Sequence, residues 1–128
     1  MERMKFDESN RKGYNLTDQD IDDIICSALE GGITYWARRA TVVGEFKGEY
    51  ASDQISRGGS LIITDREDGS KHELTKEKFI AGFDKWYNAG GDFYKAVQDD
   101  GSVDCGLIDA DRADAIVQYA LFGELVYG

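Results

Sequence analysis

Residues 17–30 carry the strongest helical pattern in this chain. Apolar side chains recur there at the spacing of one helix face, at Ile21, Ile24, Ile25, Ala28 and Leu29. Thr17 stands before this stretch as an N-cap, with Asp18 and Asp20 in the first turn. The pair Gly31-Gly32 follows it as a stop signal. An amphipathic helix needs its apolar face covered, so the rest of the chain must fold against it.

Two further helices are expected in the second half of the chain. Thr75 caps the first of them, and Gly90-Gly91 stops it. Asp109 caps the second, which Gly123 closes, leaving residues 124–127 as a short terminal strand or tail. Between these helices the sequence predicts one more helical turn over residues 92–97. Its apolar side chains, Phe93, Ala96 and Val97, are expected to face inward.

The strands are expected between the first two helices. Residues 33–43 are rich in β-branched and aromatic side chains and predict a strand bent near Ala37. Residues 45–50 predict a second short strand, and residues 52–57 a single helical turn. Residues 60–64 and 71–74, joined by a polar turn, predict a hairpin.

Helices and antiparallel strands mix in this order without a strict βαβ rhythm, which predicts the α+β class. We expect a single compact domain over residues 17–128, with a small antiparallel sheet packed against about three main helices. Residues 1–16 are expected to be a polar lead-in anchored by Phe6, Tyr14 and Leu16. A length of 128 residues and a hydrophobic content of 41% suit one domain with a real core.

Composition excludes several classes of function. There is no surplus of Lys and Arg for phosphate binding, and no apolar window of about 18 residues for a membrane span. The start lacks the apolar stretch of a signal peptide, and Cys26 and Cys105 are expected to be reduced thiols in a cytoplasmic protein. His72, the only histidine, has no partner at ligand spacing, so no metal or other cofactor is predicted. The sequence contains no recognisable catalytic motif, so we do not predict an enzyme.

The net charge of −10 is concentrated in two segments: residues 17–30 and residues 99–114 each sum to −5, whereas residues 31–98 are neutral. Such blocks favour a partner with a basic surface. Acids in first helical turns have an ordinary capping role. The candidate partner-binding residues are therefore taken from the remaining acids, and are Asp22, Asp23, Asp99, Asp100 and Asp104. The remaining acids also include Asp114.

Imitation of DNA phosphates would require both acidic segments to lie side by side. Successive helical turns rise about 5.4 Å, whereas phosphates follow one another every ~3.4 Å along a DNA strand. A single helix therefore cannot reproduce one strand.

A second group of residues is cationic and aromatic. Trp36, Arg38 and Arg57 have the side chains that bind bases and phosphates, and Gly58-Gly59 would allow a phosphate to approach the backbone closely. Strand alternation would put Trp36 and Arg38 on one face and their neighbours Tyr35 and Arg39 on the other. Core packing of the aromatic rings is the alternative interpretation.

Residues 28–36, 48–56 and 113–123 resemble a family of small acidic proteins encoded by phages and prophages. Residues 60–98 are similar to the hairpin-then-helix region of an acidic phage anti-CRISPR protein that blocks Cas9. The resemblance implies a phage protein that inhibits a host defence system in the host cytoplasm, by stoichiometric binding to a basic nucleic-acid-binding effector. The alternatives are a nucleotide-binding sponge, which would use Trp36, Arg38 and Arg57 in a homo-oligomer, and a phage accessory or structural protein.

Overall fold

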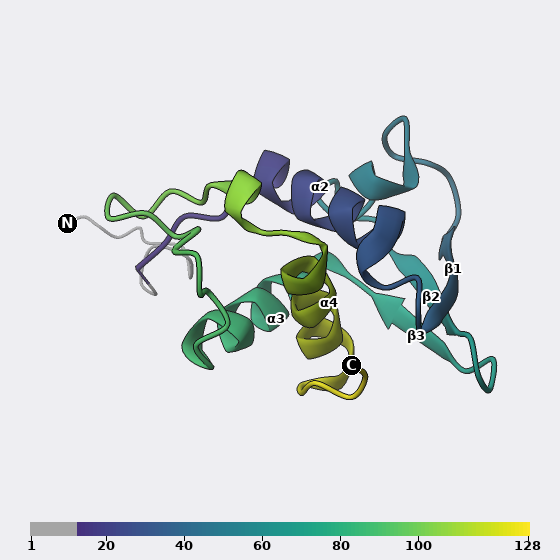
Figure 1. Cartoon of the computed structure of the whole chain (residues 1–128). Coiled ribbons are helices and arrows are strands. Elements are labelled where there is room, and N and C mark those ends of the chain that lie inside the picture. Colours follow the sequence, from purple (N-terminus) through teal and green to yellow (C-terminus); the bar gives the residue numbers. More distant parts are fainter. Residues whose placement is uncertain (1–12) are drawn as a thin grey trace.

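Three α-helices pack beside a three-stranded antiparallel sheet in the computed structural model, which describes residues 13–128 (Figure 1). The helices are α2 (Asp18–Ser27), α3 (Lys76–Asn88) and α4 (Ala110–Phe122). The strands are β1 (Ala37–Val42), β2 (Leu61–Asp65) and β3 (Lys71–Leu74), in the order β1-β2-β3. Three short helical turns join them: η1 (Ala28–Gly32), η2 (Ala51–Asp53) and η3 (Cys105–Leu107). The predicted α+β class is confirmed.

The predicted caps are present at all three helices. Thr17 and Asp20 form a reciprocal capping box, in which the Asp20 N–H donates to Thr17 Oγ1 at 3.1 Å and the Thr17 N–H donates to Asp20 Oδ2 at 3.0 Å. Thr75 and Asp109 accept from the third residues of α3 and α4. Gly123, with φ of +76°, ends α4 in the left-handed region.

The regular α-helix ends at Ser27, inside the stretch that the pattern predicts as one helix. The chain then widens into the π-helical turn η1, which ends at the predicted stop, Gly32. Gly32 is also needed for contact, since a Cβ on it would lie 2.5 Å from the Ala110 carbonyl oxygen at the start of α4. The glycine therefore lets two backbones approach closely.

The hairpin is confirmed, with Leu61 opposite Leu74 and Ile63 opposite His72. The strand predicted over residues 33–43 is shorter, and its predicted bend is present as a register shift between Ala37 and Arg39. Residues 33–36 form a turn in which the Ala37 N–H donates to the Ile33 carbonyl at 2.8 Å. The predicted alternation of Trp36 with its neighbours is therefore wrong.

The strand predicted over residues 45–50 is also wrong, because side chains from η2 and the residue after it take the place of a strand partner. Gln54 accepts from the Lys47 N–H at 3.0 Å and donates to the Glu45 carbonyl at 3.2 Å. Asp53 accepts from the N–H groups of Glu49 and Tyr50. The backbone groups of residues 45–50 are therefore paired with side chains, as in a loop, and not with a neighbouring strand.

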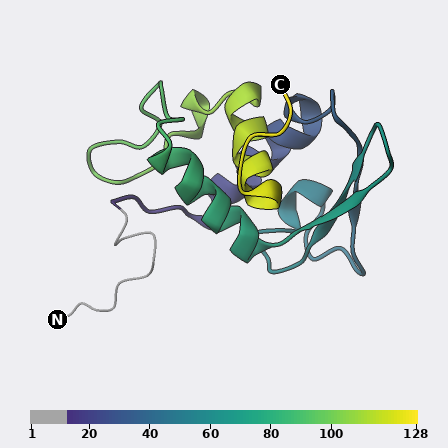
Figure 2. The ribbon, with the colours of Figure 1, turned by 90° about the horizontal axis from the view of Figure 1, so that it is seen from below.

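Residues 92–97 do not form the predicted helical turn. The Asp92 carboxylate accepts from the Ala96 and Val97 N–H groups, at 2.8 and 3.0 Å, and folds the loop over itself. Ala96 and Val97 are buried as predicted, but Phe93 is 76% exposed, so its predicted inward position is wrong. Residues 124–127 form a tail that turns back along α4 (Figure 2).

The core lies between the three helices and one face of the sheet (Figure 2). Helices α3 and α4 meet where Gly82 faces Ala120, and a Cβ on Gly82 would lie 2.5 Å from the Ala120 Cα. Tyr14 is 1% exposed, which confirms it as an anchor. Its hydroxyl donates to Asp84 at 3.0 Å. Phe6, the other aromatic anchor predicted, lies outside the described residues, as do residues 1–12 of the predicted lead-in.

Candidate functional site

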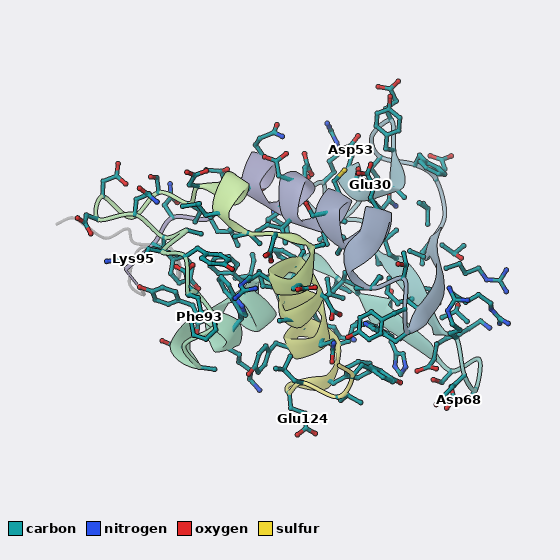
Figure 3. The ribbon with its side chains drawn as sticks, in the orientation of Figure 1. Glu30, Asp53, Asp68, Phe93, Lys95 and Glu124 are labelled. Carbon is teal, nitrogen blue, oxygen red and sulfur yellow. The ribbon has the colours of Figure 1, made fainter. Side chains whose placement is uncertain are left out.

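Acids from several elements gather along the exposed side of α2. We define the α2 acidic face as Asp20 and Asp23 of α2, Glu30 of η1, Asp53 of η2 and Asp104, which caps η3. In Figure 1 these elements follow one another along the upper edge of the molecule. Figure 3 shows Glu30 and Asp53 at the same end of α2.

The thiols of Cys105 and Cys26 are each surrounded by several acids of this face. Cys105 Sγ lies 3.5 Å from Asp20 Oδ1 and 3.7 Å from the Asp20 carbonyl oxygen. Burial, followed by the negative charges of Asp20, Asp23 and Asp104, raises the pKa of Cys105 to about 12. Cys105 therefore lies where Asp104, the cap of η3, meets the acids of α2.

Cys26, which lies on α2 one helical turn after Asp23, has a similar environment. Its pKa is raised first by burial, then by a hydrogen bond and charge from Glu30, and then by Asp23 and Asp53. Asp23 thus acts on both thiols and stands at the middle of the face. Both cysteines are free thiols, as predicted, and neither has the lowered pKa of a reactive one.

Three of the five acids predicted to bind a partner lie outside this face. Asp22 is half-buried and accepts from Ser56 Oγ at 2.5 Å. Asp99 and Asp100 belong to a separate exposed turn, in which Asp100 accepts from the Ser102 N–H and hydroxyl. The backbone of this turn, at Gly101, bonds to Asn15 ahead of α2. Only Asp23 and Asp104 are brought together.

The acids of the α2 acidic face take no part in the ion pairs of the described residues. Within residues 13–128 the ion pairs are Asp18 with Lys76, at 3.0 Å, and Asp109 with Arg112, at 3.5 Å. Neither pair includes a member of the face. Arg57 is a nearby cation, since it packs with Asp53 against Gly48, but it forms no ion pair with Asp53.

Trp36, Arg38 and Arg57 are not gathered in one site. Trp36 lines a pocket of about 330 Å³ together with Asp65, Arg66 and Glu67, and is itself only 4% exposed. Arg38 lines a separate pocket of about 180 Å³ beside β1. Neither pocket includes Arg57. The walls around Trp36 carry two acids and one base, which does not favour a phosphate.

A buried polar cluster around Trp36 was missed by the sequence analysis. Asp114, named there only among the acids without a capping role, is 8% exposed and accepts from Trp36 Nε1 at 2.8 Å, Tyr35 Oη at 2.7 Å and Gln118 Nε2 at 2.9 Å. Burial, followed by the hydrogen bond to Asp114, raises the pKa of Tyr35 to about 12. The signal in the sequence is the spacing of Asp114 and Gln118 by four, which places both beside the apolar face of one helix.

The same cluster holds the C-terminal tail. Gln118 Oε1 accepts from the Val126 and Tyr127 N–H groups, both at 2.8 Å. The Tyr127 ring stacks on Trp36 with centroids 4.9 Å apart, and its hydroxyl donates to Asp65. That hydrogen bond raises the pKa of Tyr127 to about 12 and lowers the pKa of Asp65.

Fold and site together define a small α+β domain with an acidic face along α2 and a C-terminal tail that packs over a buried tryptophan. Comparisons with known protein families, curated proteins and solved structures found no match. Among residues 13–128 there is no group of three or more His, Cys, Asp or Glu side chains that could hold a metal ion. The same residues include no helix long and apolar enough to span a bilayer.

Proposed function

We propose that this protein is a non-enzymatic, phage-encoded antagonist of a host defence system, acting in the host cytoplasm by binding one basic partner through the α2 acidic face. The observation that carries the proposal is the gathering of acids from α2, η1, η2 and η3 around Cys105 and Cys26, with Asp23 common to both thiols. The resemblance of residues 28–36, 48–56 and 113–123 to phage proteins supplies the setting.

The negative charge of this face favours a partner with a basic surface. A surface of one sign attracts a groove lined with Lys and Arg and raises the rate of encounter with it. The face spreads over several elements, so it has the breadth to cover such a groove in a nucleic-acid-binding effector, which a single helix does not. The attraction between exposed charges is screened over a Debye length of about 8–10 Å at physiological salt. Binding should therefore weaken steeply as salt is added.

The test neutralises the three acids of the face that are exposed rather than half-buried, as Asp23→Asn, Glu30→Gln and Asp104→Asn together. Plaque formation is measured on bacteria that carry defined CRISPR–Cas effectors, Cas9 first, with the protein expressed in the cells. We expect the natural chain to restore plaque formation and the triple variant to lose this activity. Purified protein should bind the same effector with a salt dependence that the triple variant flattens.

A matched control carries the same change in net charge elsewhere. Glu73→Gln, Glu77→Gln and Glu124→Gln alter three exposed acids outside the face, and this variant should inhibit as well as the natural chain. Equal loss in both triple variants would contradict a specific face. A nucleotide that stabilises the protein against heat would instead support the sponge, and a large assembly in light scattering would support an accessory role.

A further inference from the structure

Strand β1 forms one edge of the sheet, because β2 is its only neighbour among the strands of residues 13–128 (Figure 1). The Val43 N–H donates to the Ser60 carbonyl at 3.1 Å, so the backbone of Val43 faces β2. In an antiparallel pair the backbone groups of every second residue face the neighbouring strand. Thr41 therefore also faces β2, whereas the N–H and C=O groups of Ala40 and Val42 point away from it.

These outward backbone groups have no partner in the described part of the chain. Within residues 13–128, neither Ala40 nor Val42 forms a backbone hydrogen bond outside the pairing of β1 with β2. Free donors and acceptors along a sheet edge are a template for one more strand. The edge of β1 therefore offers main-chain hydrogen bonds to an extended segment.

A pocket of about 180 Å³ lies along the first half of β1. Ala37 and Ala40 of β1 line it together with Leu29 of η1 and Ile33 of the turn before β1. Its lining includes no residue of β2 or β3, so the pocket lies on the free side of β1. The volume is below the roughly 300–1,000 Å³ of small-molecule sites, and suits one apolar side chain.

The charge at this end of β1 is positive. Arg38 and Arg39 also line the pocket, are exposed, and take no part in the ion pairs of residues 13–128. Lys71 lies in the same row of the sheet as Arg39, since both are paired with Thr64 of β2. These cations attract carboxylates. They also disfavour a second copy of β1 as the added strand, because like charges would then meet.

We propose that the free edge of β1 binds an extended acidic peptide of a partner protein, in which carboxylate and apolar side chains alternate. The peptide adds an antiparallel strand that bonds to the backbone of Ala40 and Val42. One apolar side chain enters the pocket beside Leu29, and the carboxylates lie on the opposite face of the sheet, beside Arg39. The alternation fits because the Ala40 side chain packs toward the core and Arg39, its neighbour, is exposed. This surface shares no residue with the α2 acidic face.

The test titrates ¹⁵N-labelled full-length protein with the peptide acetyl-Glu-Val-Glu-Val-Glu-amide and follows the backbone amide signals by NMR. We expect saturable shifts of the Ala40 and Val42 amide signals. The peptide with Lys in place of Glu should bind about tenfold more weakly, because its charge is reversed. The peptide with Ser in place of Val should also bind about tenfold more weakly, because it cannot fill the pocket.

Two methylated peptides test the strand pairing itself. In the proposed antiparallel pairing the valine N–H groups donate to β1, whereas the N–H of the central glutamate points to solvent. A methyl group on the first valine nitrogen should weaken binding about tenfold, and one on the central glutamate nitrogen should leave binding within about twofold. Equal binding of the two methylated peptides overturns the proposal.

A pair of variants tests the charge at the edge. Arg39→Gln should weaken binding of the acidic peptide about threefold. Lys95→Gln makes the same change in charge on the loop after α3 and should leave binding unchanged (Figure 3). The proposal is also overturned by an absence of saturable shifts at Ala40 and Val42, or by equally tight binding of the serine peptide. A concentration-dependent dimer that shifts the same amides overturns it too, because the occupant would then be a second copy.

Discussion

The two tryptophans of this protein are buried to almost the same degree, at 4% exposed for Trp36 and 1% for Trp86, yet their polar surroundings are opposite. The N–H of Trp36 donates to Asp114, and the ring is covered by Tyr127. The N–H of Trp86 meets no acceptor within the described part of the chain, and an open pocket lies beside it.

The difference separates a tryptophan that is hydrogen-bonded into the fold from one that is held by packing alone. Around Trp36 each donor has an acceptor, and the bonds join the turn before β1, α4 and the tail into one unit. Removing a member of such a network leaves buried groups unpaired, which costs about 1–3 kcal/mol for each group. At Trp86 that cost is already present in the folded protein.

The largest expected effect is at Asp114. Asp114→Ala leaves the buried donors of Trp36 and Gln118 without their acceptor, and we expect it to lower the free energy of unfolding by about 2–5 kcal/mol. Tyr35, which is 51% exposed, can reach water and adds little. Urea unfolding followed by circular dichroism gives the value.

The control for this prediction is Asp111→Ala, three residues earlier on the same helix. Asp111 is exposed and lies in the first turn of α4, so its loss should cost less than about 1 kcal/mol. Equal effects of the two substitutions would show that Asp114 acts only as a first-turn charge and not through the buried network.

A smaller effect is expected from exchanging each tryptophan for phenylalanine. Trp36→Phe and Trp86→Phe remove the same ring volume, but only the first removes a hydrogen bond to a charged group. We therefore expect Trp36→Phe to cost about 1.5–3 kcal/mol more in unfolding free energy than Trp86→Phe. The same urea titration measures both. A larger loss of unfolding free energy for Trp86→Phe would contradict this prediction, because it would mean that the Trp86 N–H has a hydrogen-bond acceptor in the folded protein.

Most of the fold could be predicted because its signals are local. The caps at Thr17, Thr75 and Asp109, the stop at Gly123 and the hairpin all depend on residues within one or two turns of each other. The failures depend on distant or side-chain partners. Residues 45–50 read as a strand, but Gln54 and Asp53 supply the hydrogen bonds that a neighbouring strand would have supplied.

The site was harder to predict, because burial decides the role of an acid and burial is a property of the whole fold. Asp114 and Asp23 look alike in the sequence, yet one is the acceptor for three side chains and the other is exposed at the centre of the α2 acidic face. The burial of Trp86 without an acceptor for its N–H has no sequence signal either, since it too is a property of the whole fold.

The smallest expected effect concerns the cover over Trp36 and its dependence on pH. The hydrogen bond from Tyr127 lowers the pKa of Asp65 below the ordinary value of about 3.9. A carboxyl group whose pKa is lowered by folding contributes stability that is complete above about pH 4 and is lost as the pH falls through the pKa of the folded state. Stability measured from neutral to acidic pH should therefore fall below pH 4 partly because of Asp65.

Tyr127→Phe removes that hydrogen bond while keeping a ring to stack on Trp36. We expect the pKa of Asp65, followed by ¹³C NMR of its carboxyl carbon, to rise toward the ordinary value. Asp68 is an internal control, because its pKa is also lowered, first by a hydrogen bond from the Ser70 backbone, and should stay low in the variant. An unchanged pKa of Asp65 would mean that the tail covers Trp36 through ring stacking and Gln118 alone, without help from the carboxylate at the end of β2.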